Sequence, residues 1–295
     1  MAQRTAFLYP GQGTLPREVI PAPADFETLY GRAAEAGLSL REWIVEGDTE
    51  RLTRTDAAQP AIFLDSVVRT AVLKAAGVVP EAVAGHSLGE YPALVAAGVL
   101  SADAALRLVL RRGALMCGIP GGMAAVVRLD LEAVRALCRE VGPEVHVANH
   151  NGPTQVVVSG SDVGLEALAK AVASRGGQTL PLRVSGPFHS PFMRPAEDAL
   201  APEIARTPFA APRVPIVSSV SGAAEHDTAR LRALLATQIT SCVRWVDVLR
   251  ALGGLGITLA VEVGPGNVLT NLGRRATERI RFVTYKEAVD GALCG

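Results

Sequence analysis

Short apolar segments alternate with helical patterns over the first 116 residues, and this alternation is the feature that most limits the possible folds. The expected strands are Thr5–Tyr9 and Ala82–Gly85, and the expected helices are Asp25–Ala36, Leu40–Glu46, Asp56–Ala76, Leu88–Ala97 and Ser101–Met116. Strands separated by helices are typical of a parallel sheet with helices packed on its faces. The pattern therefore predicts a mainly parallel α/β domain.

The pattern changes between Gly121 and Ser185, where the order of the elements becomes βαββαβ. The expected elements are strand Gly122–Leu129, helix Asp130–Val141, strands Val145–Asn149 and Thr154–Gly160, helix Asp162–Arg175 and strand Thr179–Val184. This order is typical of a ferredoxin-like unit, and turn-forming residues flank it. The earlier alternation then resumes, with strand Val214–Ser218, helix Thr228–Ile239, strand Leu259–Val263 and helix Val268–Thr277. We predict a large parallel-sheet, α/β-hydrolase-like domain (residues 1–120 and 187–295) with an inserted small ferredoxin-like α+β subdomain (residues 121–186).

The composition excludes several classes of protein. The 295 residues include 29 Lys and Arg against 29 Asp and Glu, so the formal net charge is zero, whereas nucleic-acid-binding proteins normally have a basic excess. No apolar run reaches the roughly 18 residues of a membrane span, and the apolar stretch near the start is too short for a secretory signal. We expect a cytoplasmic protein. The cysteines, Cys117, Cys138, Cys242 and Cys294, show no zinc or disulfide pattern, so no metal is expected.

A nucleophile motif lies between the second predicted strand and the helix after it. Gly85–Gly89 reads G-H-S-L-G and matches G-x-S-x-G in the strand–turn–helix context that this motif requires. Such a turn presents the Ser87 hydroxyl at the carboxyl edge of the sheet and leaves the Leu88 N–H at a helix N-terminus, facing a developing oxyanion. Gln12, in the loop Pro10–Gly13 after the first strand, is the candidate for a second oxyanion donor. A glycine-rich turn without catalytic function is the alternative.

Five histidines are candidates for the general base. His86 adjoins the serine and is expected to point away from it. His146 and His150 belong to the predicted subdomain, and His226 lies in a polar loop. His189 lies where the subdomain rejoins the large domain, and clefts between domains are favoured ligand sites. We therefore predict His189 as the base, with a purely structural histidine as the alternative.

Arg112 is a candidate ligand-binding residue because of its place on the helix Ser101–Met116. It shares an apolar stripe with Ala105, Leu108, Val109 and Met116, whereas Asp103, Arg107 and Arg111 form a separate polar stripe. A guanidinium among apolar neighbours is costly unless an anion meets it, and its planar fork fits a carboxylate. That anion is either a ligand carboxylate or an internal Asp or Glu.

Eight short motifs follow one another along nearly the whole chain. They are PGQG at Pro10–Gly13, QPA at Gln59–Ala61, GHSLGEY at Gly85–Tyr91, RG..M at Arg112–Met116, AN.NGPTQVVVSG at Ala148–Gly160, PFHS at Pro187–Ser190, VRW at Val243–Trp245 and EVGPGNVLTNL at Glu262–Leu272. In this order they resemble the malonyl-CoA:acyl-carrier-protein transacylases and the related acyltransferase domains of polyketide synthases. The resemblance implies transfer of a malonyl group from CoA to the phosphopantetheine thiol of an acyl carrier protein, in fatty acid or polyketide biosynthesis, with no bound cofactor.

The resemblance also implies a role for each motif residue. Ser87 would carry the acyl group and His189 would be its base. The N–H groups of Leu88 and Gln12 would form the oxyanion hole. Arg112 would hold the free carboxylate of the malonyl group.

Two further roles and two departures come from the same resemblance. A backbone carbonyl orients the histidine in this family, and here it would belong to Arg244. Phe188 is similar to the bulky ring of malonyl-selective members, which leaves little room for a methyl branch. The segment Thr14–Arg17 departs from the family and is several residues short, and His150 and Gly152 also differ from many relatives. The shape of the cleft mouth and its contacts with the pantetheine arm are therefore open.

Two other functions are compatible with the same residues. A hydrolase of acyl-carrier-protein thioesters would use Ser87 and His189 with water as the acceptor. A non-catalytic docking subunit would need neither, so the intact set of Ser87, His189 and Arg112 argues against it. We expect a stand-alone monomeric enzyme, and the residues do not distinguish fatty acid from polyketide synthesis.

Overall fold

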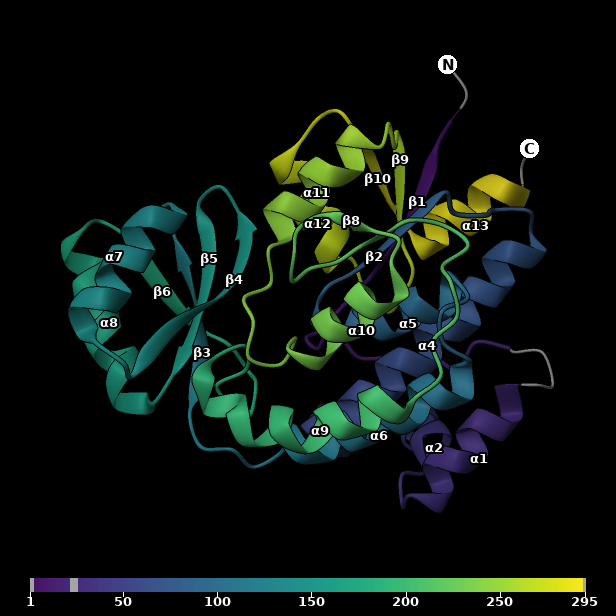
Figure 1. The fold of residues 1–295 in the computed structure, drawn as a ribbon, viewed down its shortest axis with the longest axis horizontal. Coiled ribbons are helices and arrows are strands. Elements are labelled where there is room, and N and C mark those ends of the chain that lie inside the picture. Colours follow the sequence, from purple (N-terminus) through teal and green to yellow (C-terminus); the bar gives the residue numbers. More distant parts are fainter. Residues whose placement is uncertain (1–2, 22–25, 294–295) are drawn as a thin grey trace.

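The computed structural model describes residues 3–21 and 26–293 of the chain. They form a six-stranded sheet and a separate four-stranded sheet, each with helices packed against it (Figure 1). The predicted α/β class is confirmed, since the larger sheet is mainly parallel. Two residues named in the sequence analysis, Asp25 and Cys294, lie outside the described residues.

The larger sheet places the ends of two key strands side by side. Its strands are β1 (Thr5–Tyr9), β2 (Ala82–Gly85), β7 (Ile216–Val217), β8 (Ala224–Glu225), β9 (Leu259–Glu262) and β10 (Arg281–Thr284). Their order is β10-β9-β1-β2-β7-β8, and every neighbouring pair is parallel except β7 with β8. At the carboxyl ends of β1 and β2, Tyr9 lies opposite Gly85. The loops that follow these two strands therefore meet at one edge of the sheet.

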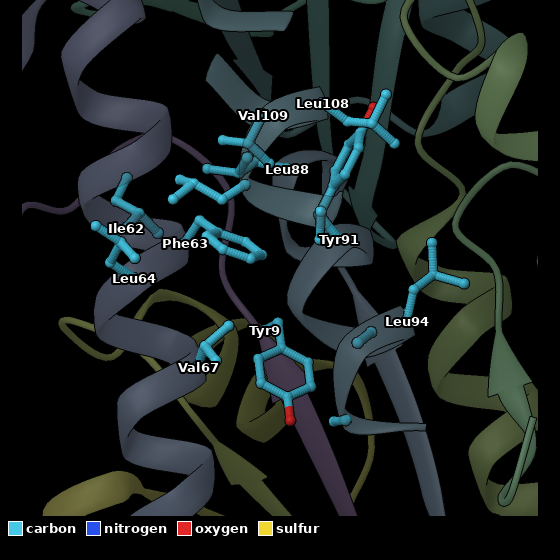
Figure 2. Packing of buried hydrophobic residues seen from close by; sticks show 14 of the residues in the cluster. Tyr9, Ile62, Phe63, Leu64, Val67, Leu88, Tyr91, Leu94, Leu108 and Val109 are labelled. Atoms are coloured by element: carbon cyan, nitrogen blue, oxygen red, sulfur yellow. The ribbon is translucent and has the colours of Figure 1, made fainter. Parts of the chain in front are cut away.

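Helices cover both faces of this sheet. They are α1 (Glu27–Glu35), α2 (Leu40–Glu46), α3 (Thr49–Thr53), α4 (Thr55–Ala75), α5 (Glu90–Ala96), α6 (Ala102–Met116), α9 (Arg194–Arg206), α10 (Thr228–Ala236), α11 (Trp245–Gly254), α12 (Val268–Ala276) and α13 (Tyr285–Leu293), with the short 3-10 helices η2 (Ser87–Gly89) and η3 (Pro191–Met193). Phe7 and Tyr9 of β1 face a cluster that includes residues of α4, α5 and α6, and Figure 2 shows Tyr9 beside Val67 of α4. Ala6 and Leu8 face the opposite cluster, with residues of α11 and α12. Burial on both faces explains why β1 is almost entirely apolar.

Several elements were not predicted from the sequence, namely α3, α9, α11, α13, β8 and β10. The strand β10 has four residues and β8 has two, too few for a periodic pattern to be diagnostic. The helix α9 contains Pro202, a residue that argues against a helix interior. The helix predicted at Asp56–Ala76 is observed as α4, Thr55–Ala75, and Pro60 lies inside it, just after its first turn.

The smaller sheet contains β3 (Gly122–Val127), β4 (Val145–Gly152), β5 (Gln155–Gly160) and β6 (Gln178–Pro181). The order β4-β5-β3-β6, with every pair antiparallel, is the arrangement that a ferredoxin-like βαββαβ unit produces. Ala124 and Val126 of β3 pack in a cluster with residues of α7 (Leu131–Val141) and α8 (Asp162–Ser174). Met123 and Ala125 belong instead to the core of the large sheet. One face of the small sheet is thus covered by its own helices and the other meets the large unit.

Backbone hydrogen bonds join the two units beside α11. His150 N–H donates to the Val243 carbonyl over 2.8 Å, and Val243 N–H donates to the Ala148 carbonyl over 2.9 Å. The strand β4 therefore continues its hydrogen bonding into a segment of the large unit. The boundaries at residues 121 and 186 stay a prediction. Among the described residues, no helix combines the length and apolar character needed to cross a bilayer.

Candidate active site

The serine lies on a sharp turn between β2 and α5. Ser87 is the first residue of η2 and has φ of +53°, a left-handed conformation that L-residues rarely adopt. The two flanking glycines make this turn possible. A Cβ on Gly85 would lie 2.0 Å from the Gly89 carbonyl carbon, and a Cβ on Gly89 would lie 2.0 Å from the Tyr9 carbonyl oxygen. Neither position therefore has room for a side chain.

His189 contacts the serine directly. Its Nε2 lies 2.7 Å from Ser87 Oγ, although 102 residues separate the two in sequence. His189 also has a positive φ, +59°, and is 4% exposed. His86, by contrast, has its Nε2 2.9 Å from Asn151 Oδ1 and its ring packed against Trp245, as its predicted orientation away from the serine requires.

Two backbone carbonyls orient His189, and neither belongs to Arg244. The Nδ1 atom lies 3.1 Å from the Gln238 carbonyl oxygen and 2.9 Å from the Ser241 carbonyl oxygen. The prediction for Arg244 is wrong because that residue is the N-cap of α11, where its carbonyl accepts the N–H of Val248. Since carbonyls only accept, Nδ1 carries the proton and Nε2 is left free to accept one from Ser87.

The surroundings of His189 favour its neutral form. Burial, the nearby guanidinium of Arg112 and the neighbouring His86 lower the pKa of His189 from 6.5 to about 3. The two carbonyl acceptors oppose this shift without reversing it. The imidazole is therefore uncharged at neutral pH, which is the state a general base needs.

Arg112 is buried beside the serine, as its place on the apolar stripe of α6 predicts, with 1% of its surface exposed. Its Nη1 donates to Gln59 Oε1 over 2.7 Å. Its Nη2 donates to Ser87 Oγ over 3.1 Å and to Gln238 Oε1 over 3.2 Å. Among the described residues, none of these partners is a carboxylate, so the internal Asp or Glu considered above is not what meets it. Burial lowers the pKa of Arg112, but a guanidinium stays charged.

Gln238 connects all of these groups, and the sequence analysis did not single it out. Its Nε2 donates to the Ser87 carbonyl over 3.0 Å and to a carboxylate oxygen of Glu90. Its Oε1 accepts from Arg112, and its own carbonyl faces His189. The side chain is fully buried. A fully buried glutamine needs partners, but the amino-acid pattern near the end of α10 contains no signal of that burial.

Glu90 and Gln59 were also missed as site residues, although both belong to recognised motifs. Glu90 accepts hydrogen bonds from Ser218 Oγ over 3.0 Å and from the Ser219 N–H over 2.6 Å. Burial raises the pKa of Glu90, and these hydrogen bonds oppose the increase. The QPA and GHSLGEY motifs were the available signals, since Gln59 belongs to the first and Glu90 to the second.

The loop after β1 lies against the serine turn. A Cβ on Gly11 would lie 2.8 Å from the His86 carbonyl oxygen and 3.6 Å from Ser87 Cβ, so the two segments are in close contact. The Gln12 side chain donates to Thr55 Oγ1 over 3.2 Å, which turns it toward α4 and leaves the backbone of this loop next to the serine. Leu88 is the second residue of η2, so its N–H is among the amides that a helix start leaves unpaired. Both candidate oxyanion donors thus belong to segments that touch Ser87.

A cleft of about 310 Å³ opens at Ser87, between the small sheet and α12. It is lined by Pro10, Gly11, Gln12, Gly13, Thr14, His86, Ser87, Met123, Ala125, Asn149, Asn151, Gln155, Val157, Leu182, Arg183, Val184, Phe188, His189, Val268, Leu269 and Leu272. Phe188 is 5% exposed, precedes His189 in the chain and lines this cleft. Asn149 Oδ1 is buried there, and no residue that the structure describes forms a hydrogen bond with it. The described residues contain no cluster of three or more His, Cys, Asp or Glu side chains able to hold a metal ion.

The sequence and the fold both match known acyltransferases. The acyl transferase domain family matches residues 31–291. The malonyl CoA-acyl carrier protein transacylase of Bacillus subtilis (strain 168) is 37% identical over 96% of this chain and 94% of its own length. The protein of the same name from Salmonella typhimurium is 38% identical over 98% of both chains.

Solved structures give the same result. An acyl-carrier-protein S-malonyltransferase from Burkholderia pseudomallei superimposes with a TM-score of 0.92 and 34% identity, covering 99% of this chain and 100% of the other. A malonyl-transacylase in complex with its type II PKS acyl-carrier protein gives a TM-score of 0.90 and 33% identity, with 99% of each chain covered. The match in sequence and fold extends over nearly the whole chain. This protein therefore belongs to the malonyl CoA-acyl carrier protein transacylase family and is an acyltransferase.

Proposed function

We propose that this chain transfers a malonyl group from CoA to the phosphopantetheine thiol of an acyl carrier protein, through a malonyl ester on Ser87. The observation that carries the proposal is the buried Arg112 beside Ser87, whose hydrogen-bond partners are all neutral. A buried cation next to a nucleophile, with no carboxylate of its own, suits an acyl group that ends in a carboxylate.

The chemistry follows from the hydrogen bonds around the serine. His189 Nε2 takes the Ser87 proton as Oγ attacks the thioester carbonyl carbon. The N–H groups of Leu88 and Gln12 stabilise the oxyanion, and one such donor contributes about 2.7–4 kcal/mol. The tetrahedral intermediate then collapses, the C–S bond breaks, and His189 returns the proton to the CoA sulfur. The carrier thiol later attacks the malonyl ester by the same steps in reverse.

Two further residues set the specificity in this proposal. Arg112 binds the free carboxylate, so acetyl-CoA leaves its charge unpaired. Phe188, buried beside His189, limits the space for a methyl branch on the acyl group. Since one thioester is exchanged for another, the reaction needs no ATP, and we propose no bound cofactor or metal.

Intact mass spectrometry tests the proposal. Malonyl-CoA is added to the protein and to Ser87→Ala, and a holo carrier protein follows. We expect a malonyl adduct on the unaltered protein only, and its transfer to the carrier faster than its loss to water. An adduct that hydrolyses without reaching the carrier would instead support the thioester hydrolase, which none of the relatives described above favours.

Steady-state kinetics test the role of Arg112. In Arg112→Ala, kcat/KM for malonyl-CoA should fall far more than kcat/KM for acetyl-CoA, because only the malonyl group has the carboxylate. Equal losses on the two donors would show that Arg112 holds the site together without binding the carboxylate.

The carrier protein partner, a monomeric state and a cytoplasmic location belong to the same proposal. Gel filtration with light scattering checks the oligomeric state. Assays with carrier proteins of fatty acid and polyketide synthases determine which pathway the enzyme serves.

A further inference from the structure

Two arginines lie at the active-site cleft, one buried and one exposed. Arg112 is buried and donates to Ser87, which lines the cleft. Arg183 is the one arginine or lysine among the residues that line the cleft, and it is exposed. The other polar side chains of the lining include the neutral Asn149, Asn151 and Gln155. The cleft therefore suits a ligand with one anionic group beside Ser87 and another at the exposed side of the cleft.

Arg183 is held at the mouth of the cleft by its neighbours. It follows β6, and the N–H of Leu182 continues the hydrogen bonding of that strand by donating to the Met123 carbonyl over 2.9 Å. Within the described parts of the chain, the Arg183 side chain has neither a hydrogen-bond partner nor an ion-pair partner. Its backbone is thus anchored, while its guanidinium is free to bind an anion.

Two exposed apolar side chains accompany this arginine. Leu182 is 37% exposed and Val268 is 44% exposed, and both line the cleft. Large apolar side chains that stay exposed at the mouth of a cleft indicate contact with an apolar part of a ligand.

The arm of the proposed substrates has the matching chemistry. In malonyl-CoA and in the malonyl-loaded carrier protein, the pantetheine arm begins at the malonyl thioester, continues through two neutral amides and ends at a phosphoryl group. The carbon that bears two methyl groups is joined to that phosphoryl group through one CH2–O link. From the malonyl end, the order is therefore carboxylate, thioester, amides, dimethyl group and phosphoryl group.

We propose that Arg183 binds the phosphoryl group at the end of the pantetheine arm, with Leu182 and Val268 against the adjacent dimethyl group. This inference rests on the proposed function and adds a specificity-determining residue to it. The same arginine then serves both halves of the reaction, because CoA and the carrier protein share this phosphoryl group. It acts on binding, since the phosphoryl group that it contacts takes no part in the exchange of the thioester bond.

The test compares donors that share the malonyl-pantetheine part and differ in the phosphoryl and nucleotide groups beyond it. KM and kcat are measured for malonyl-CoA, malonyl-4′-phosphopantetheine and malonyl-pantetheine, with the unaltered enzyme and with Arg183→Gln. For an exposed contact, we expect KM to rise about fivefold for the two phosphorylated donors. We expect no change in kcat and no change at all for malonyl-pantetheine. The KM difference should shrink at high salt, because salt screens an exposed charge.

Arg17→Gln is the matched control. Arg17 is also exposed and without a side-chain partner among the described residues, but it lines a neighbouring cleft of about 1010 Å³ that meets the first one at Gly13 and Thr14. We expect its KM values to equal those of the unaltered enzyme. A KM increase in Arg17→Gln with none in Arg183→Gln would place the phosphoryl group in that other cleft and overturn the proposal.

Two other results would also overturn it. An equal KM increase for malonyl-pantetheine would mean that Arg183 supports the shape of the cleft without binding phosphate. An increase for malonyl-CoA alone would assign the contact to the nucleotide phosphates of CoA. The malonyl adduct on Ser87 formed from malonyl-pantetheine reports separately on the proposed function, because that donor has no phosphate for Arg183 to bind.

Discussion

The serine turn and the histidine loop hold their key residues in the same unusual backbone conformation but by different means. Ser87 has φ of +53° and His189 has φ of +59°. The serine turn is held by its own glycines, which pack against each other and against the end of β1. The histidine is held by carbonyls that lie 49 and 52 residues further along the chain. The conformation of the serine turn is thus specified by a local motif. The conformation of the histidine loop depends on how a distant loop folds.

Each positive φ has a cost. For an L-residue the left-handed region costs about 1–2 kcal/mol, which the surrounding structure must offset. At the serine turn, close backbone packing supplies that stabilisation. At the histidine, hydrogen bonds from Nδ1 and burial of the ring supply it. Substitutions that remove one or the other can therefore test whether the two loops really differ in this way.

Gly89→Ala should have the largest effect, because the added Cβ would lie 2.0 Å from a backbone carbonyl oxygen that cannot move without displacing β1. We expect a loss of about 3 kcal/mol or more in the free energy of unfolding and no measurable transfer activity. Gly253→Ala is the control, since Gly253 lies in α11 with nothing within 4 Å of its added Cβ. It should be neutral or stabilising by up to about 1 kcal/mol. Thermal and urea unfolding check both, and a stable, active Gly89→Ala would break the comparison.

His189→Ala and His189→Gly should both lower kcat, by about 10²–10⁴-fold, because each removes the base. The order of their stabilities should differ from that of most pairs of alanine and glycine variants. Glycine is usually less stable than alanine in a fold, but at φ of +59° it relieves strain. The glycine variant should therefore be at least as stable as the alanine variant in urea unfolding. An alanine variant more stable by about 1 kcal/mol would mean that the left-handed conformation of this loop is not imposed by its surroundings.

Gln238→Ala should have an intermediate effect, because it removes the amide that joins Ser87, Arg112 and Glu90 but keeps the carbonyl that faces His189. Loss of one such buried hydrogen-bonding group costs about 1–3 kcal/mol, so kcat/KM should fall about 10–100-fold. Ser241→Ala is the control, since its carbonyl is part of the backbone and remains. Steady-state kinetics with malonyl-CoA measure both. A large loss in Ser241→Ala would show that the loop, and not the Gln238 amide, dominates.

The pH dependence should show the smallest effect. Because the pKa of His189 is lowered to about 3, the base stays neutral as the pH falls through 6.5, and kcat/KM should fall only at lower pH. Arg112→Gln removes one of the causes of the lowered pKa, so its acid limb should move to higher pH. The measurement is kcat/KM with acetyl-CoA, which lacks the carboxylate, from about pH 3 to pH 8, so that the range reaches the acid limb of the unaltered enzyme. Circular dichroism at each pH controls for unfolding, and identical limbs in both enzymes would exclude a charge effect of Arg112 on His189.

The sequence by itself determined the features that depend on near neighbours. The G-x-S-x-G pattern located the serine turn, because the space next to its glycines is limited by residues that follow at once. The helical stripe predicted the burial of Arg112, because helix geometry fixes which residues share a face. The order βαββαβ predicted the small antiparallel sheet, because these elements follow one another directly along the chain. His189 could be named as a candidate only from its place between two units.

Only the tertiary structure decided what the site residues contact. It assigned the orientation of His189 to the carbonyls of Gln238 and Ser241, and not to that of Arg244. It also gave Arg112 neutral partners, and joined Gln238 to a serine 151 residues away. Such contacts depend on how loops far apart in sequence pack against one another, and no periodic pattern in either segment specifies the partner. Local steric limits are determined by residues that are neighbours in sequence, whereas hydrogen-bond partners across a cleft are determined by the whole fold.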